Sequence, residues 1–218
     1  GVPSLSEFKE VIDQVAPLIR SQGARGVGFA EVVTHSNLRA FQARMNRAVP
    51  GFSVASSRAR EIYAPITMLE PSDWRDRATL GHDFLNEPEK LAAIEAAAHS
   101  GETALALPLG SQGSKSNFFR DGFLLFLPIY KHGNSATAAG AAKNLNGLRG
   151  VLYSPINFKE FFGLIFGEPN LSEEQVNFEI TAAQTGQLIY NRFGLEVNKA
   201  QAWPLVDRSI ELHGLKLN

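Results

Sequence analysis

The sequence predicts an α+β protein in which a helix lies on an antiparallel sheet. Two strand-like runs, Ile62–Met68 and Phe123–Ile129, are separated by an alanine-rich helical segment, Pro88–Ser100. A short apolar run, Ala104–Leu107, follows this helix, so that the order is strand, helix, strand and strand. Elements in this order build a small mixed domain with one helix packed on a sheet.

The segment before residue 50 is predicted to be mainly helical. Ser4 and Glu7 form a capping-box pattern, and the apolar residues that follow recur at helical spacing. Pro17 fits this first helix only near its C-terminal turn. A short apolar strand is expected over residues 27–33 and a second helix over residues 38–49.

The sheet is expected to begin at Phe52–Val54 and to continue after the central helix. Asn86 is placed to cap that helix, and Gly101 lies just beyond its end. The run Phe123–Ile129 is apolar at nearly every position, which predicts a central strand that is buried on both faces. A polar loop, residues 110–121, precedes this strand.

The C-terminal third contains a further strand, a helix and then several short strands. Leu148–Tyr153 predicts the strand, and the phenylalanine-rich run Phe158–Phe166 predicts the helix. Three strand-like runs follow, at Val176–Thr181, Leu188–Arg192 and Ser209–Leu217. They indicate a second, smaller sheet after about residue 155.

Composition excludes several classes of function. The 218 residues are 44% apolar and 20% charged, which is ordinary for a soluble globular protein. A net charge of -1 gives no electrostatic basis for binding nucleic acid. The chain has no cysteine, which excludes disulfides, thiolate zinc sites and a cysteine nucleophile. No apolar run approaches the roughly 18 residues that span a bilayer, so the chain is expected to be soluble as given. It is also compatible with a soluble piece of a membrane protein.

No catalytic or metal-binding pattern stands out. The five histidines lack metal-ligand spacing, and only His82 lies beside a carboxylate. There is no P-loop and no nucleophile elbow. We therefore expect no catalytic residue, no metal and no cofactor. Asp83 has two open interpretations: it accepts hydrogen bonds from a ligand in a desolvated cavity, or it caps a helix or pairs with Arg77.

Several short motifs occur together in one order along residues 25–165. They are Leu38-Arg-Ala-Phe41, Tyr63-Ala-Pro-Ile66 with Glu70-Pro71, Leu80-Gly-His-Asp83, Gly122 to Tyr130, and Leu148-Arg-Gly-Val151 before a phenylalanine-rich helix. In this combination the chain resembles the CHASE family of extracytoplasmic sensory domains, which are attached to membrane histidine kinases and nucleotide or diguanylate cyclases. The plant cytokinin receptors contain members of this family.

The resemblance implies a long N-terminal helix followed by two PAS-like antiparallel-sheet subdomains. Residues 1–50 would form a helical stalk region, residues 51–155 a membrane-distal ligand-binding subdomain, and residues 156–218 a smaller membrane-proximal subdomain. The chain would then be the periplasmic or extracellular part of a membrane receptor, with transmembrane helices on both sides. Any enzymatic output would belong to a separate cytoplasmic domain.

The resemblance also implies a site for a small molecule of unknown identity. The motif alignment assigns hydrogen bonds to the Asp83 carboxylate and the Leu105 main chain. The walls of the pocket would come from Tyr63, Ile66, Met68, Leu107, Phe126 and Val151. Phe126 replaces a threonine of the cytokinin receptors, and its ring would shrink or reshape the pocket. Retention of Asp83 favours an amine or another ligand with an N–H group.

Two alternative functions and one interaction remain as expectations. The chain could instead be a soluble hydrolase or transferase that uses Asp83 with His82, or a ligand-free ectodomain that binds a protein. A homodimer through the first helix is expected to use its apolar stripe, Phe8, Ile12, Val15 and Ile19. The alternative is that part of this stripe packs on its own domain.

Overall fold

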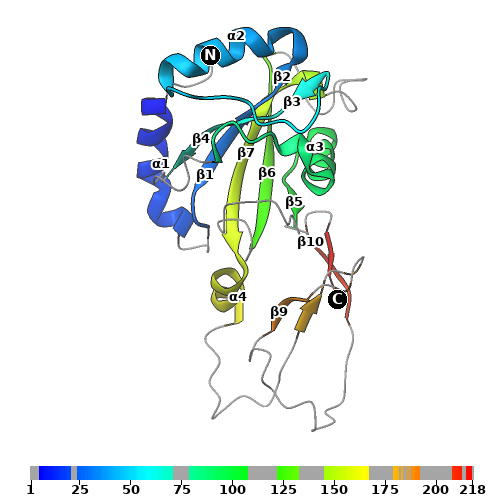
Figure 1. The fold of residues 1–218 in the computed structure, drawn as a ribbon. Helices are drawn as coiled ribbons and strands as arrows, with labels where there is room; N and C mark the ends of the chain where they lie inside the picture. The colour runs from blue at the N-terminus through cyan, green and yellow to red at the C-terminus, as the bar shows by residue number, and fades with distance from the viewer. Residues whose placement is uncertain are drawn as a thin grey trace.

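The computed structural model confirms an α+β protein built around a five-stranded antiparallel sheet (Figure 1). It describes residues 5–20, 24–70, 79–107, 122–132, 145–166, 179–181, 183, 186, 188–191, 208–212 and 215–217. The loop expected at residues 110–121 and the possible partner Arg77 lie outside these ranges.

The sheet joins strands that are far apart in the sequence. Its order is β4-β1-β7-β6-β5, and every neighbouring pair is antiparallel. The strands are β1 Val27–Glu31, β4 Ile66–Glu70, β5 Ala104–Ala106, β6 Gly122–Tyr130 and β7 Leu148–Asn157. The strand predicted at Phe123–Ile129 corresponds to β6, which has partners on both sides. β7 extends four residues beyond the predicted strand end at Tyr153.

Helices cover both faces of this sheet (Figure 1). Helix α1, Leu5–Arg20, packs Phe8 and Ile12 on Phe29 and Met68 of the sheet. Helix α3, Pro88–Ser100, lies on the opposite face, where Ala93, Ile94, Ala97 and Ala98 contact the core. The small alanine side chains allow the helix backbone to approach the strands closely. The predicted bounds of α3 are confirmed.

Two further helices lie at the ends of the sheet. Helix α2, Leu38–Ala48, packs Phe41 and Met45 against Val33 and Phe52, beside the short pair β2 Val33–Thr34 and β3 Ile62–Tyr63. Helix α4, Phe158–Phe166, follows β7 directly, and the Asn157 side chain accepts a hydrogen bond from the Glu160 amide.

The start of β1 and the end of β7 lie side by side at one end of their ladder. Ala24 forms an isolated bridge with Ile156, and the Arg25 amide donates to the Pro155 carbonyl at 2.9 Å. The Arg25 guanidinium also lies 3.4 Å from the Glu160 carboxylate at the start of α4. The entry to β1 and the exit from β7 are therefore joined directly.

The C-terminal strands form two separate pairs. They are β8 Glu179–Thr181 with β9 Leu188–Asn191, and β10 Ile210–Leu212 with β11 Leu215–Leu217. None of the described helices is long and apolar enough to cross a membrane.

Two local predictions are wrong, and one predicted domain boundary falls within the sheet. Residues 52–54 form no strand, because Phe52 packs into the α2 cluster instead. The cap residue of α3 is Glu87 and not Asn86, whose side chain is engaged elsewhere. Strand β1 pairs with β4 and β7, so the boundary expected at residue 50 separates strands of one sheet. The division into subdomains stays a prediction.

Candidate functional site

The turn around Asp83 is built by backbone conformation and by the carboxylate itself. Gly81 has a φ of 84°, a left-handed conformation that favours glycine, and a Cβ there would meet the Ser53 carbonyl. Asp83 then caps the short 3-10 helix η3, Phe84–Asn86, through a hydrogen bond from the Leu85 amide at 3.1 Å. Asp83 therefore caps η3 and not the longer helix α3, whose cap residue is Glu87.

The Asp83 carboxylate joins three segments of the chain. Its side chain is fully buried. Oδ1 accepts hydrogen bonds from the Ala64 amide at 2.8 Å and from Leu85. Oδ2 accepts one from the Ser56 hydroxyl at 3.1 Å. A buried carboxylate needs such donors, because an unpaired charge in the interior is costly. The arrangement leaves Oδ2 with fewer described donors than Oδ1.

An aromatic cluster lies next to this turn. The Phe84 ring meets Phe126 and Tyr153 edge-to-face, at centroid distances of 5.2 Å and 4.9 Å. All three residues are buried at 1% exposure or less. Edge-to-face pairs of this kind are favourable beyond their buried area. Phe126 therefore fills the space beside Asp83's neighbour Phe84.

A charged group next to Phe84 was not predicted. Glu87 Oε1 lies 2.8 Å from His82 Nε2 and 2.5 Å from Lys90 Nζ. The Lys90 side chain is only 5% exposed, and its ammonium lies 5.4 Å from the Phe84 ring centroid. Burial lowers the pKa of Lys90, and the Glu87 charge offsets part of this effect. The i,i+3 spacing of Glu87 and Lys90 is the sequence signal that could have indicated the pair.

His82 and Asp83, the pair named in the hydrolase alternative, have different hydrogen-bond partners. His82 is hydrogen-bonded to Glu87, whereas the Asp83 carboxylate binds the donors of Ala64, Leu85 and Ser56. Within the part of the chain that the structure describes, no group of three His, Asp or Glu side chains could hold a metal ion.

The predicted site residues are all buried, but they lie in different places. Ile66, Phe126 and Val151 belong to the core on the α3 face of the sheet. Met68 lies under α1, and Leu105 and Leu107 pack with Phe123 in a cluster next to α4. β5, which contains Leu105, is the edge strand of the sheet and pairs with β6.

Tyr63 has a distinct role beside the turn. Its hydroxyl accepts a hydrogen bond from the Arg60 amide at 2.9 Å and lies 3.1 Å from His35 Nδ1. No sequence signal marked Ser56, and Asn86 was predicted only as a helix cap. The side chains of both complete the surroundings of Asp83. Their contacts depend on a long-range approach of the chain.

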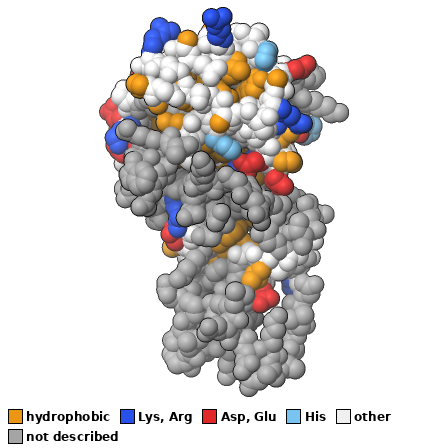
Figure 2. Space-filling model, in the orientation of Figure 1, with side chains coloured by type: hydrophobic (Ala, Val, Ile, Leu, Met, Phe, Trp, Pro, Cys, Tyr) orange, Lys and Arg blue, Asp and Glu red, His pale blue; other side chains and the backbone are white. Residues whose placement is uncertain are grey.

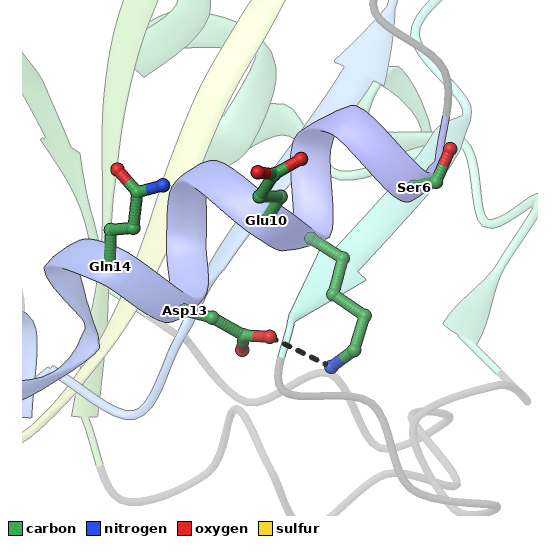
Figure 3. Close-up of a pocket in the computed structure, with 5 residues that line it drawn as sticks. Ser6, Glu10, Asp13 and Gln14 are labelled. Carbon is green, nitrogen blue, oxygen red and sulfur yellow. Dashed lines mark ion pairs between the residues drawn. The ribbon is translucent and has the colours of Figure 1, made fainter.

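A shallow hollow on the outer surface of α1 has no comparable features. It is lined by Ser6, Lys9, Glu10, Asp13 and Gln14, all from one helix (Figure 3). The ion pair of 3.4 Å between Lys9 and Asp13 runs along this exposed face. On the face that Figure 2 shows, the coloured Lys, Arg, Asp and Glu side chains are dispersed and do not form one patch of a single sign.

The fold and the site define a class of protein, an α+β domain with a buried carboxylate at the turn before a short helix. Residues 3–190 match the CHASE domain family, so the chain belongs to that family. CHASE domains are extracytoplasmic sensory domains of receptors and are not catalytic. No curated protein matches the chain.

Proposed function

We propose that this chain binds a small molecule at Asp83 and transmits a conformational change across a membrane. The receptor would be of the histidine kinase or diguanylate cyclase type, with its output in another part of the protein. The observation that supports the proposal most directly is the Asp83 carboxylate, which is fully buried and whose Oδ2 has the Ser56 hydroxyl as its one donor among the described residues. The five-stranded antiparallel sheet with α3 on one face supports the PAS-like architecture.

The chemistry of Oδ2 indicates the class of ligand. A carboxylate oxygen can accept two hydrogen bonds, and Ser56 is the one described donor to Oδ2. An amine or a ring N–H could occupy the second position or replace the hydroxyl of Ser56. A cationic donor would form a charge-assisted bond, which is roughly twice as strong as a neutral one. We therefore propose a ligand with an N–H group.

A ligand at this position would have to change the packing of the aromatic cluster. In the proposed pocket Ile66, Phe126 and Val151 form the wall nearest to Phe84, since they share one core cluster with it. Tyr63 lies beside the same turn. Met68, Leu107 and the main chain of Leu105 stay predictions for the site, since Met68 packs under α1 and Leu105 and Leu107 pack next to α4. Displacement of Phe126 would shift β6, which pairs with β7 along nine residues of its length.

Transmission requires that the ligand bind the two states of the sheet with different affinities. β7 continues into α4 without an intervening loop, and Arg25 ties the start of β1 to the same junction. A change in the sheet would therefore reach the segment before β1 and the helix α4 after β7 together. This arrangement supports signalling through the stalk and the membrane-proximal region.

The first test is a thermal-shift screen with amines, adenine derivatives, amino acids and organic acids. A ligand that binds only the folded state raises the melting temperature in a concentration-dependent way. Asp83→Asn is the informative variant, because its amide oxygen can still accept from Ala64 and Leu85 while Oδ2 is lost. Asp13→Asn, at an exposed position on α1, is the matched control.

The outcomes separate the site from the function. A shift that Asp13→Asn keeps and Asp83→Asn loses supports the proposed site. A shift that Asp83→Asn retains overturns the site and keeps small-molecule sensing. The absence of a shift for every compound class would instead favour a ligand-free ectodomain that binds a protein. The burial of Phe126 beside Phe84 is the observation that favours this second candidate.

A further inference from the structure

We infer that residues 55–60, called the strap below, cover the Asp83 carboxylate and open as one unit. The strap is the segment Ala55-Ser-Ser-Arg-Ala-Arg60 between α2 and β3. The inference rests on the proposed function, because it names the step that gives a ligand access to Asp83. It concerns the regulation of that site and can be tested without any ligand.

The first end of the strap is attached to the Asp83 turn by backbone groups. The Ala55 amide donates to the Gly81 carbonyl at 2.8 Å, and the Asp83 amide donates to the Ala55 carbonyl at 3.4 Å. Ala55 also forms an isolated bridge with His82. The exchange of the Asp83 amide hydrogen therefore reports whether the strap is in place over this residue.

Asn86 holds the middle of the strap. Its Oδ1 accepts from the Ser57 amide at 3.1 Å and lies 2.9 Å from the Ser57 hydroxyl. Its Nδ2 donates to the Ala55 carbonyl at 3.0 Å. One side chain of η3 thus contacts both the beginning and the middle of the strap, which favours opening of these parts together.

The Ser56 hydroxyl can leave Asp83 without losing all partners. Its oxygen lies 3.1 Å from Asp83 Oδ2, 3.2 Å from Asn86 Oδ1 and 3.0 Å from the Arg58 carbonyl. A serine hydroxyl has one hydrogen, so it donates to one of these acceptors at a time. A ligand donor that takes Asp83 Oδ2 therefore leaves Ser56 with another acceptor inside the strap.

The second end of the strap is attached to a buried tyrosine. The Arg60 amide donates to the Tyr63 hydroxyl at 2.9 Å, and Tyr63 is 3% exposed. Because Tyr63 belongs to β3, this bond joins the strap to the folded core. The strap is thus attached at both ends and in the middle by hydrogen bonds.

Apolar packing contributes little to closure. No residue of the strap belongs to the hydrophobic clusters of the described chain, and Ala55, Ser57, Arg58 and Ala59 are exposed. In contrast, Phe84 and Leu85 of η3, which follow Asp83, are buried. A segment held mainly by hydrogen bonds opens at a lower free energy than the whole domain unfolds. Opening of the strap therefore leaves the core intact.

Hydrogen exchange of the ligand-free protein, read by NMR, tests this inference. The amides of Asp83, Ser57 and Arg60 report the beginning, the middle and the far end of the strap. We expect one common opening equilibrium for the three amides, faster than that of the β6–β7 ladder. Asn86→Ala should speed exchange about tenfold at all three, the factor that loss of one or two hydrogen bonds produces.

The matched control is Asn46→Ala. Asn46 makes the same kinds of contact in the neighbouring loop, since its Oδ1 accepts from the Gly51 amide and its Nδ2 donates to the Phe52 carbonyl. This variant should speed exchange at Gly51 and leave Ser57 and Arg60 unchanged. Tyr63→Phe perturbs the strap from its far end and should speed exchange at Ser57 and Asp83 as well.

Two results would overturn the inference. Faster exchange at Ser57 alone in Asn86→Ala would mean that the strap does not open as a unit. Faster exchange at Ser57 and Arg60 with an unchanged Asp83 amide would mean that the carboxylate stays covered. Should Asn86→Ala fail to fold, Tyr63→Phe gives the same decision. A thermal-shift screen without any shift would contradict the proposed function, whereas the hydrogen-exchange measurement would still test the strap.

Discussion

Asp83 combines a structural contact and a proposed binding contact in one carboxylate. Its Oδ1 satisfies the amides of Ala64 and Leu85, and its Oδ2 receives the Ser56 hydroxyl. The sequence indicated the importance of this residue and left two interpretations open. The internal hydrogen bonds could not be predicted, because Ser56 and Ala64 reach Asp83 only after the chain has folded.

Asp83→Ala and Asp83→Asn should separate the two kinds of contact. Alanine leaves two buried amides without an acceptor, and each such group costs about 1–3 kcal/mol. We expect the free energy of unfolding to fall by about 3 kcal/mol or more for Asp83→Ala and by about 1 kcal/mol for Asp83→Asn, measured by denaturant unfolding. Equal losses in the two variants would show that the Ala64 and Leu85 bonds do not stabilise the fold.

At the scale of the element, the helices were the most predictable part of the fold. The helix α3 has local end signals, Pro88 in its first turn and Gly101 in the left-handed conformation after its end. Its start was nevertheless assigned to the wrong cap, because Asn86 bonds across to Ser57. Residues 52–54 resemble a strand in composition, but Phe52 packs against the apolar side of α2. Competition from long-range contacts explains both errors.

Two glycines with nearly the same backbone conformation allow a controlled test of the Asp83 turn. Gly81 and Gly51 have φ values of 84° and 83°, but only the Gly81 position would place a Cβ against backbone, at the Ser53 carbonyl. A left-handed conformation costs a non-glycine residue about 1–2 kcal/mol. Gly51→Ala should lower the free energy of unfolding by about that amount, and Gly81→Ala by clearly more. Similar losses would contradict the close packing of the turn on residue 53.

The Glu87 carboxyl at the start of α3 gives the domain a defined response to acid. Burial raises its pKa, but the hydrogen bond from His82 and the charge of Lys90 together lower it below the ordinary 4.5. In the window between the two pKa values the unfolded chain binds more protons, so stability rises with pH there. The contribution of Glu87 is present above the unfolded pKa and is lost as pH falls through the folded one.

Urea unfolding of wild type and Glu87→Gln between pH 3 and 7 tests this effect. The difference between their free energies of unfolding should be constant above about pH 5 and should shrink below about pH 4. Glu95→Gln, on the exposed side of the same helix, is the matched control. A Glu87→Gln curve that runs parallel to wild type down to pH 3 would contradict the assignment.

For the whole molecule, the sequence predicted the fold class but not the composition of the sheet. β1 lies between β4 and β7, although 34 residues separate Glu31 from Ile66 and more than 100 separate it from Leu148. A strand was predicted here, but its five residues show no feature that places it in the middle of the sheet. Register and neighbour order depend on which apolar faces meet, and this information is not local.

A dimer through α1 stays a prediction, and the exposure of the residues of α1 limits which of them it could use. Phe8 and Ile12 pack on the sheet, whereas Val11 and Val15 are 58% and 38% exposed. A dimer along this helix would therefore use Val11 and Val15, and the side chain of Ile19 lies outside the described residues. Packing on the chain's own domain is thus confirmed for half of the expected stripe.

Val11→Lys combined with Val15→Lys tests the proposed dimer. Substitutions at exposed positions usually change stability by about 0.5 kcal/mol or less, so the fold should persist while the dimer dissociates. Sedimentation equilibrium measures the association, and denaturant unfolding measures the stability. Phe8→Ala is the contrasting variant and should lower the free energy of unfolding by about 3–5 kcal/mol. A dimer that survives the double lysine substitution would place its interface elsewhere.

The bridge between Ala24 and Ile156 gives the domain a preferred direction of mechanical weakness. A load that separates α1 from α4 acts on two neighbouring strands at the end of their ladder. The hydrogen bonds of β1 and β7 then break one after another, beginning with the bond from Arg25 to Pro155. A load along the strands would instead strain all of these bonds at once. The domain should therefore yield to a small sideways pull between its two connections while it resists stretching along the sheet.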